Sequence, residues 1–167
     1  MQTVVCDSSV LIHLAKIKRL HLLKDFYEKI MIPPAVWKEV VEEGKGKDEV
    51  KLVKEAYNSG WTVIETPSNK PLVKLLERYL HPGEAETIAL AVEKSALILI
   101  DESEGRRIAD IYGLQKTGVI GILIMAKLKE KISSIQKELD KLRYRGGFWI
   151  SDEIYKKALE SVGEQKS

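Results

Sequence analysis

Two aspartates stand directly after the two runs of the chain that read most clearly as buried strands. Asp7 follows residues 3–6, and Asp101 follows residues 96–100, a run without any polar side chain. In an open parallel sheet, ligands bind in the crevice beyond the carboxyl ends of the strands. Glu84 opens a predicted helix just before the second strand, so its carboxylate can join the two aspartates. Because three clustered carboxylates repel one another, we expect a hard divalent cation, Mg²⁺ or Mn²⁺, to neutralise them.

Several polar neighbours compete for a place at this site. Glu86 lies two residues after Glu84, and helical residues two apart point about 200° away from each other, so only one of them is expected to bind the metal. Glu102, in the loop after the second strand, is a reserve ligand or an exposed loop charge. Ser8 or Ser9 is expected to hydrogen-bond a water molecule or a phosphate, although helix capping explains Ser9 equally well.

The elements that must position these side chains alternate between strands and helices. Strands are expected at residues 3–6, 30–32, 61–65 and 96–100, with a candidate short strand at 148–150. Helices are expected at residues 10–17, 20–29, 34–43, 48–58, 72–80, 84–94, 104–112, 119–129 and 133–144, and from residue 151 onward. This alternation predicts an α/β domain with a mostly parallel central sheet and helices on both faces. Residues 163–167 are expected to form a frayed tail.

Length and composition set the broad class of the protein. A chain of 167 residues with a hydrophobic fraction of 44% is the right size for a single domain with one sizeable core. Its 27 basic and 25 acidic residues nearly cancel, so any polyanion must be held by a local patch rather than by overall charge. Charged residues make up 31% of the chain, which leans toward a thermophilic source.

The single cysteine and the composition of the first ten residues favour a cytoplasmic protein. Cys6 is the only cysteine, which excludes an intrachain disulfide and a thiolate metal cluster. The first ten residues lack the pattern of a signal peptide, and the longest apolar stretch, residues 119–126, is far shorter than the roughly 20 residues that span a membrane. The three histidines, at positions 13, 21 and 81, are too scattered for a zinc site, and no serine and acid stand near them as a nucleophilic triad requires.

Five segments together resemble the PIN-domain nucleases. They are Asp-Ser-Ser after the first strand, Ile-Pro-Pro-x-Val-x-x-Glu ending at Glu39, Pro-Gly-Glu-Ala-Glu-Thr-Ile-Ala-Leu-Ala at residues 82–91, Leu-Ile-Asp-Glu followed by Gly-Arg-Arg-Ile-Ala at residues 99–109, and Gly-Val-Ile-Gly-Ile-Leu from Gly118, leading into Ala-Lys at 126–127. The last segment also resembles the small prokaryotic PIN-like proteins related to VapC toxins. The likeness covers roughly residues 3–150, and the combination is far more specific than any single motif.

The resemblance implies a metal-dependent endoribonuclease on a Rossmann-like sheet. By position in the motifs, the acidic site residues would be Asp7, Glu39, Glu84 or Glu86, and Asp101. It also implies RNA as substrate, a role as the toxin half of a toxin-antitoxin pair, an antitoxin protein as partner, and a homodimer. Residues 1–150 would form the PIN-like domain, and residues 151–167 would add a C-terminal helix and tail to the same domain.

An acidic pocket repels RNA, so positive side chains must flank it. Arg106 and Arg107, shortly after the second aspartate, are the nearest pair in sequence and are candidates for binding phosphate. Three nearby lysines at positions 127, 129 and 131 and the segment 137–145 would extend the basic patch, or else form ordinary exposed helix faces.

The chain departs from the commoner PIN pattern in two ways. A glutamate stands where an aspartate usually begins the helix, and no second aspartate follows the fourth strand, where Glu102 and Glu104 are the nearby acids. The alternative is therefore a catalytically weak or inactive module that binds metal or a partner protein. An aspartyl-nucleophile phosphatase is disfavoured, because its chemistry needs an acid two residues after Asp7, and Ser9 stands there.

Overall fold

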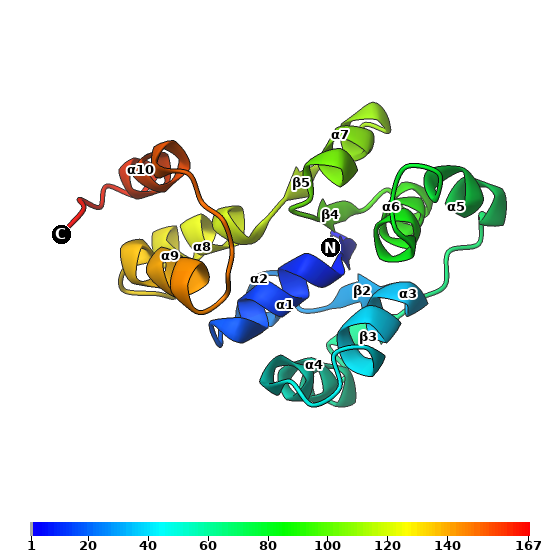
Figure 1. The fold of residues 1–167 in the computed structure, drawn as a ribbon, viewed down its shortest axis with the longest axis horizontal. Coiled ribbons are helices and arrows are strands. Elements are labelled where there is room, and N and C mark those ends of the chain that lie inside the picture. The colour runs from blue at the N-terminus through cyan, green and yellow to red at the C-terminus, as the bar shows by residue number, and fades with distance from the viewer. Residues whose placement is uncertain (1) are drawn as a thin grey trace.

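A five-stranded, all-parallel sheet forms the centre of the molecule (Figure 1). The computed structural model describes residues 2–167. The strands are β1 (Val4–Cys6), β2 (Ile30–Ile32), β3 (Thr62–Ile64), β4 (Leu97–Leu99) and β5 (Lys116–Thr117), in the spatial order β3-β2-β1-β4-β5. Every strand pair is parallel, with β1 next to β4 in the register Cys6↔Leu99. The predicted parallel sheet is confirmed.

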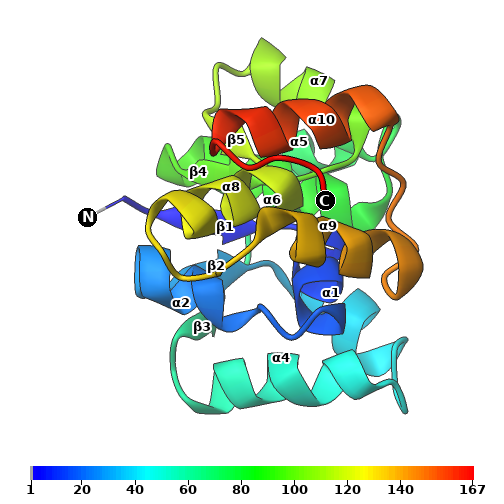
Figure 2. The same cartoon turned by 90° about the vertical axis from the view of Figure 1, so that its left-hand side faces the viewer.

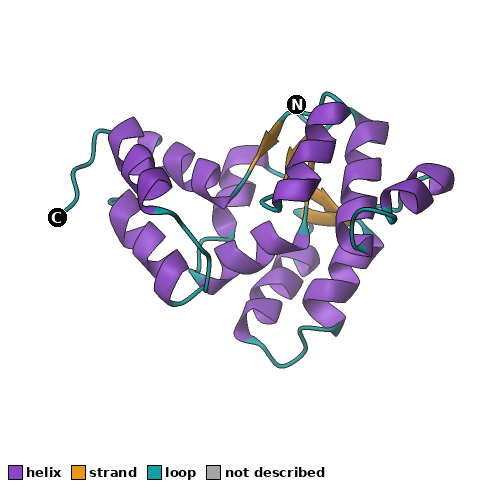
Figure 3. Cartoon of the chain, turned by 45° about the horizontal axis from the view of Figure 1, so that its top comes forward, coloured by secondary structure: helices purple, strands orange, loops and turns teal. Residues whose placement is uncertain are grey.

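Helices cover both faces of this sheet, as the sequence predicts (Figures 2 and 3). They are α1 (Ser8–Lys16), α2 (His21–Tyr27), α3 (Pro34–Trp37), the π-helix η1 (Lys38–Glu42), α4 (Asp48–Asn58), α5 (Lys70–Leu76), α6 (Pro82–Lys94), α7 (Ser103–Ile111), α8 (Val119–Leu128), α9 (Ile135–Tyr144) and α10 (Asp152–Ser161). Because side chains alternate along a strand, Cys6 points into a core shared with α1, α2, α4 and α8, whereas Val5 points into a second core shared with α5, α6 and α7. The chain is one α/β domain.

The C-terminal helix shares the larger core. Tyr155, Ala158 and Leu159 of α10 are buried in the same cluster as β1, and α10 packs against α8 and α9. No helix within residues 2–167 is long and apolar enough to cross a membrane.

The observed elements differ from the expected ones at three places. The strand expected at residues 148–150 is wrong, because these residues form an irregular segment in which Phe148 packs on His13. The strand β5 was not predicted, since it has two residues and no apolar run. The helix expected at residues 34–43 begins as α3 but continues as the π-helical turn η1, a geometry that propensity does not reveal.

Candidate metal centre

The carboxyl edge of the sheet brings Asp7 and Asp101 to the ends of two neighbouring strands. The backbone N–H of Asp7 donates to the carbonyl oxygen of Leu99 at 2.9 Å, so the ends of β1 and β4 lie next to each other. The side chain of Asp7 is completely buried, and that of Asp101 is partly buried. Parallel pairing in register therefore produces the juxtaposition that the sequence predicts.

Each of the two aspartates has one buried carboxylate oxygen without a hydrogen-bond partner. These atoms are Oδ1 of Asp7 and Oδ2 of Asp101. The other oxygen of each is bound: Asp7 Oδ2 accepts from Ser9 Oγ at 3.4 Å, and Asp101 Oδ1 accepts from the N–H of Val119 at 3.2 Å. Buried oxygens are almost always paired, because leaving one unpaired costs free energy. Two anionic oxygens of this kind on neighbouring strand ends fit a divalent cation.

Burial makes both aspartates hard to ionise without such a cation. The pKa of Asp7 is raised from 3.8 to about 7, mainly by burial; the carboxylates of Glu84 and Glu39 contribute to the rise, and the N–H of Ser8 and the nearby His81 oppose it. Burial likewise raises the pKa of Asp101 to about 6, against the N–H of Val119 and the nearby guanidinium of Arg106. Groups with strongly perturbed pKa values at a strand edge are typical of functional sites.

Glu84 reaches the same edge from the first turn of α6. Its side chain is buried, and its Oε1 lies 3.1 Å from Nε2 of His81. His81 is the N-cap of α6, where its Nδ1 accepts the N–H of Glu84 at 3.4 Å. Burial raises the pKa of Glu84, and the neighbouring His81 lowers it. A Cβ atom added to Gly105 would lie 3.6 Å from Glu84 Oε2, so the start of α7 closes over this carboxylate.

Glu86 points elsewhere, which separates the two glutamates that the sequence leaves open. Its Oε1 accepts the N–H of Ala35 at 3.2 Å and so satisfies a free donor at the start of α3. Glu84, not Glu86, is the member of the pair that lies with the aspartates.

Glu39 lies at the rim of the site, on the π-helical turn η1. Its Oε2 accepts a short hydrogen bond from Ser8 Oγ, and its Oε1 lies 3.6 Å from His81 Nδ1. About a third of the Glu39 side chain is exposed. Ser8, a candidate for binding phosphate, is thus engaged in holding Glu39 beside His81.

The two candidate arginines have different positions. Arg106 donates from Nη1 to the carbonyl oxygen of Ile100 at 2.7 Å, which places its guanidinium at the end of β4 next to Asp101. Arg107 is exposed and pairs with Glu104 on its own helix at 3.2 Å. Of these two arginines, only Arg106 therefore flanks the acidic residues.

The acidic side chains do not surround a common point. Within residues 2–167, no three His, Cys, Asp or Glu side chains are grouped closely enough to hold a metal ion by themselves. The arrangement is instead a pair of unpartnered aspartate oxygens, with Glu84 and Glu39 held nearby through His81 and Ser8.

A family model described as a PIN domain matches residues 3–164. The chain belongs to the PIN-domain family. PIN domains are generally nucleases and typically use divalent metals, in keeping with the two aspartates at the strand ends. A search of curated proteins finds no match.

His81 is the residue of this PIN domain to which sequence reasoning gave no role. It contacts Glu84 and approaches Glu39, so it joins two acids that lie far apart in sequence. The available signal was its position directly before Pro82, where a helix starts and an N-cap side chain can accept a free N–H.

Proposed function

We propose that this PIN domain is a metal-dependent endoribonuclease that hydrolyses RNA phosphodiester bonds. The observation that carries the proposal is the pair of buried, unpartnered oxygens of Asp7 and Asp101 at the carboxyl edge of the sheet. A fold without a cation there would leave both atoms unsatisfied at a cost in stability. Proteins retain costly polar groups of this kind mainly where function needs them.

Asp7 and Asp101, with Glu84, would hold Mg²⁺ or Mn²⁺. Such an ion, when bound, lowers the pKa of a water molecule and offsets the charge that develops on the phosphate. The chain's own groups orient these ligands: the N–H of Val119 fixes Asp101, and Ser9 holds one oxygen of Asp7. Glu39 lies at the rim of the site, where its Oε2 accepts from Ser8 and its Oε1 lies 3.6 Å from His81 Nδ1. Glu39 would orient the attacking water through Oε1.

Positive groups around the acids would bind the phosphates of the substrate. Arg106 lies beside Asp101, and α1, α6, α7 and α8 all begin at this edge of the sheet. The N-terminus of a helix carries partial positive charge and free N–H groups, which favour anions. These groups would draw an RNA phosphate toward carboxylates that otherwise repel it.

The direct test is RNA cleavage by the purified chain with Mg²⁺ or Mn²⁺. We expect cleavage that stops with EDTA and in an Asp7→Asn variant, and continues in Asp110→Asn, which changes an exposed aspartate of α7. Cleavage that persists in EDTA or in Asp7→Asn would show that the activity does not arise from this site.

A metal-binding or protein-interaction module without catalysis is the second candidate. It is favoured by the lack, within residues 2–167, of three donors already grouped around one point, and by the pairing of Glu104 with Arg107 on the surface. Calorimetric binding of Mn²⁺ at Asp7 without any cleavage of RNA would support this alternative over the nuclease.

We further propose that the chain acts as the toxin of a toxin-antitoxin pair, with a protein antitoxin as partner. The support is the resemblance of the segment from Gly118 to the PIN-like proteins related to VapC toxins. Induced expression should stop bacterial growth, and Asp7→Asn should relieve the arrest. Unchanged growth with abundant folded protein would contradict the toxin role.

A further inference from the structure

The segment that joins α9 to α10 exposes an unusually large aromatic side chain. Trp149 is 83% exposed, and Tyr144, at the end of α9, is 81% exposed. An exposed tryptophan leaves a large apolar surface in water, and such side chains are typical of binding surfaces.

The backbone around Trp149 is held in place on both sides. The Phe148 ring packs edge-on against the ring of His13 with centroids 4.9 Å apart, and its N–H donates to the carbonyl oxygen of Leu142 at 3.0 Å. On the other side, Arg143 donates to the carbonyl oxygen of Ile150 at 2.7 Å. Trp149 is therefore presented by an anchored segment, which lowers the entropy cost of binding.

His13 connects this segment to the acidic site through one face of α1. Ser9, His13 and Lys16 are all partly exposed and recur at the three- and four-residue spacing of a single helix face. Ser9 contacts Asp7 Oδ2 at 3.4 Å, and its carbonyl oxygen lies 2.7 Å from His13 Nδ1. At a helical rise of about 1.5 Å per residue, His13 lies roughly 9 Å along α1 from Asp7.

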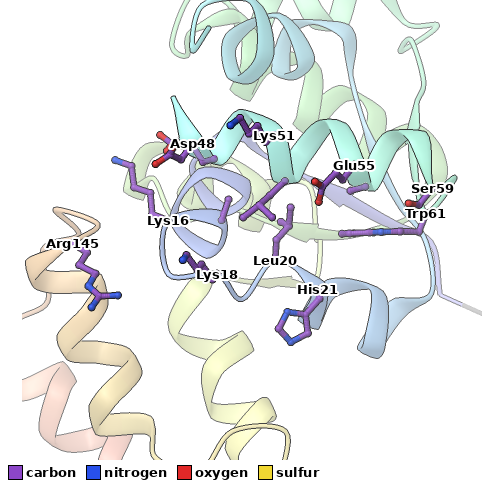
Figure 4. A pocket seen from close by; sticks show the side chains of 14 residues that line it. Lys16, Lys18, Leu20, His21, Asp48, Lys51, Glu55, Ser59, Trp61 and Arg145 are labelled. Carbon is purple, nitrogen blue, oxygen red and sulfur yellow. The ribbon is translucent and has the colours of Figure 1, made fainter. Parts of the chain in front are cut away.

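The far end of this face carries cations. Lys16, Lys18 and Arg145 line one end of a pocket of about 850 Å³ between α1 and α4, with Trp61 at the other end (Figure 4). None of these three cations forms an ion pair with another residue of the segment 2–167. The opposite wall, from α4, carries Asp48, Glu49 and Glu55 together with Lys51. Acids outnumber cations on that wall, so the wall that carries Lys16 and Lys18 is the more basic one.

We propose that single-stranded RNA leaves the acidic site along α1, with one base stacked on Trp149 and the following phosphates bound by Lys16, Lys18 and Arg145. The proposal rests on the nuclease function proposed above, and it names the substrate class and the path of the strand. An exposed aromatic ring on the segment that follows Arg145 suits single strands, because each unpaired base offers its face for stacking. In a duplex those faces are covered by neighbouring bases.

Binding of labelled RNA in EDTA tests this path without any need for cleavage. The probe is a fluorescein-labelled RNA of about 12 nucleotides, used as a single strand and annealed to its complement. We expect the full chain to prefer the single strand and Trp149→Ala to bind it about 5- to 100-fold more weakly. Trp149→Phe should keep most of the affinity, and Tyr112→Ala, at the C-cap of α7, should match the unchanged chain. Arg145→Gln should reduce the salt dependence by about one phosphate contact.

Equal binding of the single strand by Trp149→Ala and the unchanged chain would overturn the proposal, as would equal affinity for the duplex. A loss of self-association in Trp149→Ala, with RNA binding intact, would also overturn it and mark a protein interface instead. If the cleavage rate is the same in Trp149→Ala and in the unchanged chain, the nuclease function is supported and the path over Trp149 is contradicted. Binding through Trp149 without cleavage would support this path and contradict the nuclease.

Discussion

Two buried acids in this protein have opposite surroundings. Glu138 on α9 is as inaccessible as Asp7, but both of its oxygens are paired: Arg19 donates to them at 2.9 and 3.1 Å, and Lys141 at 3.3 Å. Burial raises the pKa of Glu138, yet the hydrogen bonds and charges of Arg19 and Lys141 outweigh it and hold the pKa below its usual value. Asp7 lacks a cationic partner of this kind within residues 2–167, and its pKa rises to about 7.

The difference shows that burial of an acid does not by itself indicate function. Glu138 joins α9 to the segment after α1 and stabilises the fold through its own partners. Asp7 costs stability as the chain stands, because its buried Oδ1 has no hydrogen-bond partner within residues 2–167. The pairing of the carboxylate oxygens, rather than their exposure, separates the structural acid from the candidate functional one.

The largest effect that this comparison predicts is on activity. Asp7→Asn should lower Mn²⁺-dependent RNA cleavage by about 100- to 1000-fold, because the amide cannot replace an anionic ligand worth several kcal/mol in the transition state. Glu138→Gln, the matched change at the paired acid, should leave the cleavage rate within about threefold in single-turnover kinetics. Equal losses in both variants would erase the distinction.

The next effect is on stability, at the paired acid. Arg19→Ala should lower the free energy of unfolding by about 2 kcal/mol, since it leaves the buried Glu138 without its bidentate partner. Partial exposure of the Arg19 side chain keeps the loss below that of a fully buried pair. Urea denaturation at pH 7 measures it, and the same experiment at low pH should give a smaller loss, because protonated Glu138 no longer needs the cation. A loss that does not change with pH would point to packing alone.

At Asp7, the unpaired acid, a substitution should stabilise the protein rather than destabilise it. Asp7→Asn should raise the unfolding free energy of the metal-free protein at pH 8 by about 1–2 kcal/mol, because burial penalises the ionised carboxylate. Protonated Asp7 contributes stability that is complete below pH 3.8 and is lost as the pH rises through about 7. The difference in stability between the variant and the unchanged chain should therefore grow as the pH rises across this window, which thermal melts measure.

Added Mn²⁺ should raise the melting temperature of the unchanged chain but not that of Asp7→Asn. A destabilised Asp7→Asn protein at pH 8 would contradict the assignment.

The smallest effect separates two neighbouring glutamates of α6. Glu86→Gln should cost about 0.5–1 kcal/mol of stability, because the amide oxygen accepts the N–H of Ala35 less strongly than the carboxylate does and the negative charge at the start of α3 is lost, with little change in cleavage. Glu84→Gln should lower cleavage about tenfold or more while stability changes little, because its carboxylate is buried with a raised pKa. Paired denaturation and cleavage assays on the two variants measure both quantities. The reverse pattern would exchange their roles.

Much of the carboxyl edge of the sheet could be predicted from the sequence, because it depends on local patterns. The apolar runs before Asp7 and Asp101 define buried strands, and the parallel order follows from the alternation of strands with helices. The strand β5 and the irregular segment around Phe148 escaped prediction, since both depend on contacts with distant residues. The π-helical turn that carries Glu39 also escaped, because local propensity does not distinguish it from an α-helix.

The sequence alone determined that Asp7 and Asp101 end two buried strands and that a helix carrying two glutamates begins before the second. Only the tertiary structure decided that Glu84 turns toward the aspartates while Glu86 meets α3, and that His81 lies between Glu84 and Glu39. It also decided which buried acids have partners, since Arg19 and Glu138 are 119 residues apart in the chain. The physical reason is that residue type and spacing fix periodicity and backbone preference, whereas pairing between side chains depends on how distant elements pack.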